Sequence, residues 1–92
     1  MNEKEWEKIF KALGNENRLK IIKMLWGGKK MSVSEIRQKL GISYKWTSLN
    51  LNNLKRVGIL ESRGARGQVF YYMSPKLSKK VISVIRPFLP RQ

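Results

Sequence analysis

Side chains that can hydrogen-bond to the edges of nucleobases gather between residues 44 and 52 of this sequence. An asparagine amide donates and accepts at once, so Asn52 carries the pair of groups that matches adenine in a DNA major groove. Tyr44 and Leu49 offer apolar surface that suits the methyl group of thymine. Together with Lys45 and Ser48, these residues form the set that we predict to contact bases, at a site that favours A·T pairs.

Basic side chains flank this segment on both sides. Arg63 and Arg66 stand beside Gly64 and Gly67, and a glycine-rich turn lets a backbone approach a ligand closely. Arginine suits a phosphate pair or a narrow minor groove. An ordinary surface hairpin rich in arginine is the alternative. The residues that we predict to contact the DNA backbone, or to lie on the hairpin that touches it, are Lys29, Lys30, Lys39, Ser43, Lys55, Arg56, Arg63, Arg66 and Gln68.

The chain as a whole is strongly basic. Lysine and arginine together number 20 against 6 acidic residues, which gives a net charge of +14 over 92 residues. An imbalance of this size destabilises a compact fold through self-repulsion, and a bound polyanion relieves it. Nucleic acid is therefore the first candidate partner and an anionic membrane the second. A thermophile's lysine-rich surface is a third explanation, but such surfaces balance lysine with glutamate and this one does not.

Composition excludes most other chemistry. The sequence contains no Cys and no His, which removes disulfides, the usual zinc and copper ligands, and histidine-based catalysis. Its glutamates are scattered or clustered at a helix start, so we expect neither an enzyme, nor a metal site, nor a cofactor. No segment reaches the roughly 20 apolar residues of a membrane span, and the polar N-terminus does not resemble a signal peptide. We therefore expect a cytoplasmic, nucleoid-associated protein that makes no membrane contact.

Hydrophobic spacing and capping residues predict the elements that position these side chains. Helices are predicted over residues 3–13, 16–26, 33–40, 44–57 and 75–86. Ser32 with Glu35 makes a capping box, and Asn15, Ser43 and Ser74 are the other predicted N-caps. Gly14 is predicted to end the first helix in a left-handed conformation.

The third and fourth helices are joined by the short turn of Gly41, Ile42 and Ser43. The fourth helix should bury Thr47, Leu51 and Leu54, and residues 59–63 and 68–73 should pair as an antiparallel hairpin. This order predicts one domain over residues 1–92, mostly α with a small β-hairpin wing (α+β), in the order ααααββα. It is the arrangement of a winged helix-turn-helix, which sets one helix into the major groove of DNA.

Three segments, in this order, resemble the arsenic-repressor-like (ArsR-type) winged-helix family. Residues 12–22, ALGNENRLKII, are similar to its opening pattern, in which a capping Asp or Asn precedes Arg-Leu-x-Ile. Residues 40–60 are similar to its recognition helix and exit, and residues 63–72 to its wing, which commonly ends in Val-x-Tyr-Tyr. The resemblance covers about residues 10–74.

The resemblance implies a homodimer that packs its first and last helices across a two-fold axis. Completion of the monomer's own core is the alternative role for the apolar residues of these helices. The residues that we predict at the dimer interface are Trp6, Phe10, Val81, Ile85, Phe88 and Leu89.

The sequence also departs from the family. Metal-sensing members place cysteines in the third helix or Asp and His in the last, and neither set is present in this chain. Metal sensing is therefore not expected, and no small-molecule effector can be named. Several roles stay open. Tyr44 and Trp46 either pack on a neighbouring helix or face DNA, and Arg18 either contacts phosphate or caps and bridges helices. For Asn50, Asn52 and Asn53 the alternative is an ordinary solvated helix surface.

These observations predict a homodimeric transcriptional regulator that binds specific double-stranded DNA, most simply a repressor that occludes a promoter. The recognition helix would lie in the major groove and the wing on the minor groove or backbone. One alternative is a chromatin-like architectural protein of low sequence specificity, which the high charge favours. Another is a winged helix that contacts proteins of the transcription machinery.

Overall fold

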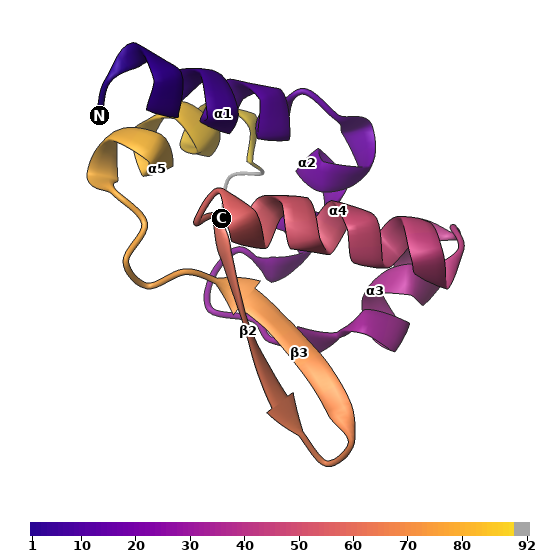
Figure 1. The fold of residues 1–92 in the computed structure, drawn as a ribbon. Helices are drawn as coiled ribbons and strands as arrows, with labels where there is room; N and C mark the ends of the chain where they lie inside the picture. The colour runs from indigo at the N-terminus through magenta and orange to yellow at the C-terminus, as the bar shows by residue number, and fades with distance from the viewer. Residues whose placement is uncertain (90–92) are drawn as a thin grey trace.

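Two N-terminal helices lead into a helix-turn-helix and then into a long hairpin (Figure 1). The computed structural model describes residues 1–89 of the chain. Its elements are α1 (Glu3–Leu13), α2 (Glu16–Leu25), β1 (Met31–Ser32), α3 (Val33–Leu40), α4 (Tyr44–Arg56), β2 (Leu60–Ala65), β3 (Gln68–Met73), α5 (Lys79–Ile85) and the short 3-10 helix η1 (Arg86–Phe88).

The predicted winged helix-turn-helix is confirmed, and the structure adds one strand that the sequence pattern did not reveal. β1 pairs with β3, Met31 opposite Tyr71 and Ser32 opposite Phe70, in an antiparallel sheet of order β1-β3-β2. A strand of 2 residues is too short to show the alternation that identifies strands in a sequence. β1 places the start of α3 beside the middle of β3.

Local capping fixes the helix-turn-helix. Asn15, Ser32 and Ser43 are the N-caps of α2, α3 and α4, as predicted, and each side chain accepts a backbone N–H from the first turn of its helix. Gly41 ends α3 with φ of 69°, a left-handed conformation that a residue without Cβ adopts at little cost. This turn sends α4 across α3 (Figure 1).

Two predictions about helix boundaries were wrong: the conformation of Gly14 after α1, and the start of the last helix. Gly14 follows α1 with φ of −80°, not in the left-handed region. The last helix begins at Lys79 with Ser78 as its N-cap, not at Pro75 with Ser74. The Ser74 hydroxyl instead donates to Glu61 Oε2 at 2.6 Å and accepts the N–H of Lys76 at 3.2 Å, so it ties down the segment before α5 and starts no helix.

One hydrophobic core unites all five α-helices and the sheet. In α4, Thr47, Leu51 and Leu54 are fully buried, as predicted. Val81 and Ile85 of α5 also belong to this core. Their predicted place at a dimer interface is therefore corrected: the buried side of α5 closes the protomer's own core, and only its outer side can meet a second chain.

Candidate nucleic-acid interface

The solvent side of α4 carries every residue that we predicted to contact bases. One turn of an α-helix takes about 3.6 residues, so the side opposite the buried residues of α4 projects outward. Tyr44 is 59% exposed and Leu49 48%; Lys45 and Asn52 are also exposed, and Ser48 is half-buried. The structure therefore brings these five side chains together on one accessible helix face, as contact with DNA requires.

Trp46 lies on the flank of α4, not in the core. Its side chain is 59% exposed, and it lines a groove of about 480 Å³ together with Ile42, Leu49 and Arg18. The groove runs between α4 and the start of α2. Packing on the neighbouring helix was one of the two roles considered for Trp46. Any such packing leaves most of its ring accessible to solvent.

Arg18 is both a cap and a bridge. Its Nε donates to the carbonyl of Ala12 at 2.7 Å and its Nη2 to that of Lys11 at 3.3 Å, so it satisfies the C-terminal end of α1. Its Nη1 donates to Asn50 Oδ1 at 3.3 Å. Asn50 is 7% exposed, and its Nδ2 donates to the carbonyl of Trp46 at 2.9 Å. Arg18 and Asn50 therefore anchor α4 to the α1–α2 corner from behind the proposed DNA face.

The hairpin extends away from the helices, on the side of the molecule opposite α1 and α5 (Figure 1). β2 runs to Ala65, two residues beyond its predicted end, and Gly64 pairs with Val69 inside the ladder. The tip is thus the pair Arg66 and Gly67, with φ of 54° and 73°. Positive φ at both central residues defines the type I′ turn that matches the twist of paired strands.

Arg66 is costly for this turn, because a left-handed conformation disfavours a side chain with Cβ by about 1–2 kcal/mol. Asparagine tolerates the conformation better. We therefore expect Arg66→Asn to stabilise the fold by about 0.5–1 kcal/mol. The same change should weaken binding to every duplex and lower the log–log salt slope by about one for each phosphate that the tip no longer touches. Chemical denaturation and fluorescence anisotropy at several salt concentrations measure the two effects.

The matched control is Lys20→Asn, which removes the same charge from an exposed position on α2. Equal affinities for DNA in Arg66→Asn and in the unaltered protein would show that the tip does not touch DNA.

All nine residues predicted to contact the DNA backbone or to lie on the hairpin are exposed. Lys30 lies over the ring of Tyr72, 5.2 Å from its centroid, while Arg56 faces the groove beside Arg18. Ser43 caps α4 and accepts the N–H of Trp46 at 3.1 Å.

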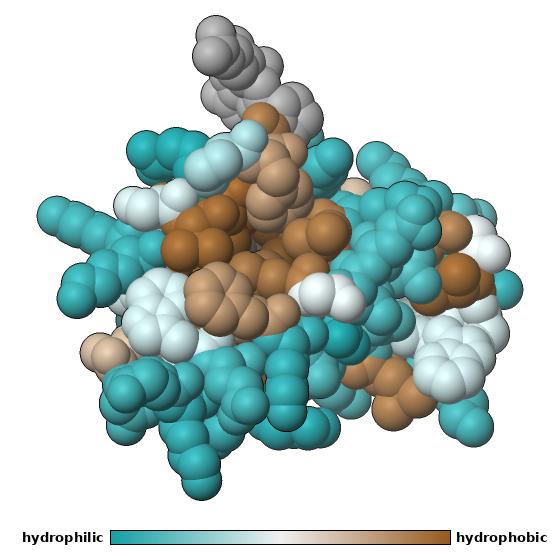
Figure 2. Space-filling view, turned by 90° about the horizontal axis from the view of Figure 1, so that it is seen from above, coloured by the Kyte–Doolittle hydropathy of each residue, from teal (hydrophilic) through white to brown (hydrophobic). Residues whose placement is uncertain are grey.

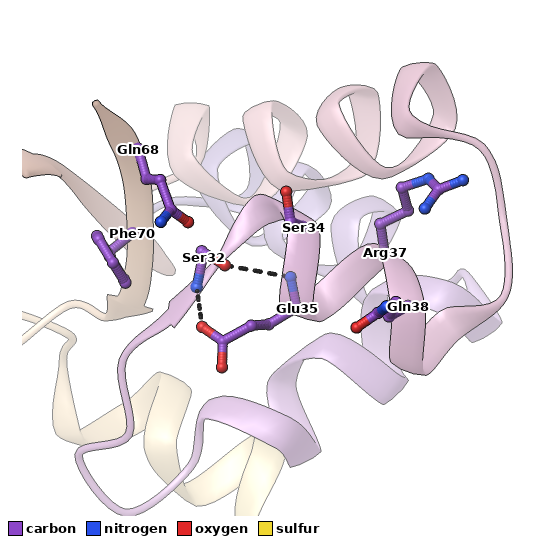
Figure 3. A pocket seen from close by; sticks show the side chains of 7 residues that line it. All are labelled: Ser32, Ser34, Glu35, Arg37, Gln38, Gln68 and Phe70. Carbon is purple, nitrogen blue, oxygen red and sulfur yellow. Dashed lines mark hydrogen bonds between the residues drawn. The ribbon is translucent and has the colours of Figure 1, made fainter. Parts of the chain in front are cut away.

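A corner between α3 and β3 adds three residues that we did not predict from the sequence. Ser34, Arg37 and Gln38 of α3 and Gln68 of β3 line a pocket of about 320 Å³ (Figure 3). Hydroxyl, guanidinium and amide donors suit phosphate oxygens, and the first helix of a helix-turn-helix crosses the DNA backbone. Their spacing at i, i+3 and i+4 was a visible signal of a common helix face.

Glu35 borders the same corner, but its carboxylate is engaged in the capping box. Glu35 Oε1 accepts the N–H of Ser32 at 2.9 Å, and Ser32 Oγ accepts the N–H of Glu35 at 3.1 Å (dashed in Figure 3). Hydrogen bonds from the Ser32 backbone and then from its side chain lower the pKa of Glu35 below its ordinary value of 4.5. The acid is thus held ionised and directed at the start of α3.

Because the pKa of Glu35 is lower in the folded than in the unfolded protein, its ionised carboxylate stabilises the fold. This stabilisation is complete at pH values above the pKa of the unfolded state, and it is lost as the pH falls through the pKa of the folded state. We expect Glu35→Gln to lower the free energy of unfolding at pH 7, and the difference from the unaltered protein to shrink below about pH 4.5. Urea unfolding at pH 7 and at pH 3 measures it. A difference that stays constant across this range would contradict the assigned role of the carboxylate.

Two side-chain hydrogen bonds join the recognition helix to the wing. The Tyr71 hydroxyl donates to Asn52 Oδ1 at 3.2 Å, and Lys55 Nζ donates to Ser62 Oγ at 2.7 Å. Burial, and secondarily the neighbouring Tyr44, raises the pKa of Tyr71 above its ordinary value of 10.0, so this hydroxyl is a proton donor at neutral pH. The sequence offered no signal for either pairing.

An apolar surface covers the outer side of α1 and α5, and Figure 2 shows it framed by hydrophilic side chains. Phe10 is 54% exposed and Val84 38%, and the Trp6 and Phe10 rings stack with centroids 5.5 Å apart. These three residues line a shallow groove of about 550 Å³; we call them the α1–α5 face. Phe88 and Leu89, also predicted at an interface, are half-buried against the core. Val84 was not predicted.

Within residues 1–89, no helix is both long enough and apolar enough to cross a membrane. The same residues hold no group of three or more His, Cys, Asp or Glu side chains that could bind a metal ion.

Comparison with known proteins places the chain among transcriptional regulators. Residues 13–63 match a family model described as a helix-turn-helix domain. An HTH-type transcriptional regulator of Methanocaldococcus jannaschii is 35% identical over 84% of this chain and 86% of its own length. The transcriptional activator HlyU of Vibrio cholerae is 34% identical over 92% of this chain and 84% of its own length.

Solved structures of transcriptional regulators also superpose on this chain. Reduced HlyU from Vibrio cholerae superposes with a TM-score of 0.79 at 32% identity, over 94% of this chain and 86% of that one. The homodimeric winged helix-turn-helix DNA-binding domain of Mb0332 from Mycobacterium bovis superposes with a TM-score of 0.77 at 25% identity, over 91% of this chain and 74% of that one. The transcriptional repressor BigR from Xylella fastidiosa superposes with a TM-score of 0.73 at 30% identity, over 92% of this chain and 84% of that one.

Proposed function

Because the chain belongs to the ArsR-type family of winged helix-turn-helix, DNA-binding transcriptional regulators, we propose that it binds a specific double-stranded DNA operator as a homodimer. The observation that carries the proposal is the solvent face of α4, where side chains able to hydrogen-bond to bases lie beside the wing. No catalytic group is needed, since the family consists of regulators and not enzymes.

The dimensions of α4 suit the major groove. Its 13 residues span about 20 Å, and the groove is about 12 Å wide, enough to admit an α-helix. With α4 in the groove, Arg63 and Arg66 of the hairpin reach the backbone or the adjacent minor groove. The donors of the corner between α3 and β3 are then available to a phosphate. Phosphate contacts supply affinity and position, and α4 supplies sequence preference.

The α1–α5 face supports the homodimer. It lies on the side of the protomer opposite the wing (Figure 1), so a two-fold contact there leaves both recognition helices accessible. Stacked Trp6 and Phe10 beside Val84 provide the apolar centre that homodimer interfaces favour. The homodimeric Mycobacterium bovis domain described above is the related precedent.

Repression by promoter occlusion needs only tight, specific DNA binding. The family supplies both outcomes, since HlyU is described as an activator and BigR as a repressor. We favour repression for this chain because each residue that we assign to function serves DNA binding or dimer contact.

Selection of binding sites from a random duplex library tests the proposal. We expect two inverted, A·T-rich half-sites whose centres are one helical turn, about 34 Å, apart, bound by two protomers. A selection that enriches no sequence would leave the architectural role that the net charge of +14 favours. A failure to bind any duplex would leave the protein-interaction role. Either result would overturn the proposal, whereas G·C-rich half-sites would overturn only the base preference.

A further inference from the structure

A side chain of the wing holds the amide of the recognition helix that is best suited to reading a base. The Tyr71 hydroxyl donates to Asn52 Oδ1 at 3.2 Å. From this contact, and resting on the proposed function, we infer that Tyr71 is a positioning residue: it fixes the orientation of the Asn52 amide and thereby sets the base preference of α4.

Tyr71 is a rigid support for this contact. It lies in β3, the central strand of the sheet, between Met31 of β1 and Ser62 of β2. Only 7% of its surface is exposed. A ring packed in this way has little freedom, so the hydroxyl at its end occupies a defined place beside α4.

Asn52 gains a single orientation from that hydroxyl. An exposed asparagine amide can turn over and exchange its carbonyl oxygen, an acceptor, for its NH2 group, a double donor. In the structure the Tyr71 hydroxyl donates to Oδ1, and this contact directs that oxygen toward the wing. The other lone pair of that oxygen and the NH2 group are then offered to DNA in one fixed arrangement.

A second bond makes the wing and α4 move together at this point. Lys55 lies three residues beyond Asn52 on α4, and its Nζ donates to Ser62 Oγ at 2.7 Å. Ser62 is the register partner of Tyr71 in β2. A displacement of the hairpin as it meets DNA is therefore transmitted to the Asn52 amide, so backbone contact by the wing and base recognition by α4 are coupled.

The test compares affinities for the selected operator, its single base-pair variants and random duplex at one salt concentration. We expect Tyr71→Phe, which keeps the ring, to reduce the preference at one base pair by about tenfold. The affected base pair is the one that Asn52→Ala affects. Affinity for random DNA and the salt slope should not change, and the double variant should behave as Asn52→Ala alone.

Tyr72→Phe is the matched control, because Tyr72 is the next residue of the same strand and its ring lies under Lys30. It loses the same hydroxyl and should keep full preference. An unchanged preference in Tyr71→Phe, or an equal loss on all duplexes, would overturn the inference and leave the proposed function standing. If the unaltered protein itself shows no preferred operator, the inference and the proposed function fail together.

Discussion

Replacement of Arg18 with alanine is expected to lower the free energy of unfolding by about 2–4 kcal/mol. The guanidinium group donates to the carbonyls of Ala12 and Lys11 and to Asn50 Oδ1. Alanine leaves the end of α1 and a buried side chain of α4 without these donors, and unsatisfied polar groups are costly in a protein interior. In a domain of this size, the loss corresponds to a decrease in melting temperature of about 10–20 °C.

Thermal and urea denaturation measure this effect, with two companion variants. Lys20→Ala removes a charge from an exposed position on the same helix and should change the free energy of unfolding by less than about 0.5 kcal/mol. Arg18→Lys keeps the charge but cannot reach the same three acceptors, so it should restore little of the loss. A stability of Arg18→Ala equal to that of Lys20→Ala would show that the bridge is not structural.

Replacement of Phe10 with glutamate is expected to convert the homodimer to a monomer and to weaken operator binding by at least about a hundredfold. The side chain is 54% exposed in the protomer, so the folded monomer should tolerate the change. In the proposed dimer the same position is central, and an unpaired charge buried there opposes association by several kcal/mol. A monomer also loses the second half-site and its phosphate contacts.

Sedimentation velocity gives the oligomeric state, and anisotropy with labelled operator gives the affinity. Lys4→Gln, at an exposed position of α1 outside the α1–α5 face, lowers the net charge by the same one unit and controls for the change of charge. A Phe10→Glu variant that still sediments as a dimer would place the interface elsewhere, and an unaltered protein that sediments as a monomer would remove the dimer from the proposal.

Elements with local causes were predictable from the sequence. The N-caps at Asn15, Ser32 and Ser43 act within one helical turn, and the turn at Gly41 needs only a residue that accepts positive φ. Helical periodicity likewise identified the buried and solvent sides of α4. The type of fold followed from the order of these elements.

Features with distant causes were not predictable. Ser74 and Ser78 are equally good caps in sequence, and nothing local shows that Ser74 binds Glu61, 13 residues away, while Ser78 caps the helix. The apolar pattern of α5 showed a buried side, but nothing local told whether a core or a second chain buries Val81 and Ile85.

The same limit holds for the candidate site. The exposed face of α4 was evident from its spacing, whereas the bonds that orient it join residues 19 and 32 positions apart in the sequence. Ser34, Arg37 and Gln38 were visible as one face of α3. They gained a role only when β3 brought Gln68 beside them.

The ratio between two affinities tests the central claim most directly: the Kd for random duplex divided by the Kd for the selected operator, both at one physiological salt concentration. Nonspecific contacts to phosphate contribute to both values, so the ratio isolates what α4 reads. A sequence-specific regulator should give a ratio of about 10³ or more. A ratio near one would contradict the account and leave a protein that binds DNA through its charge alone.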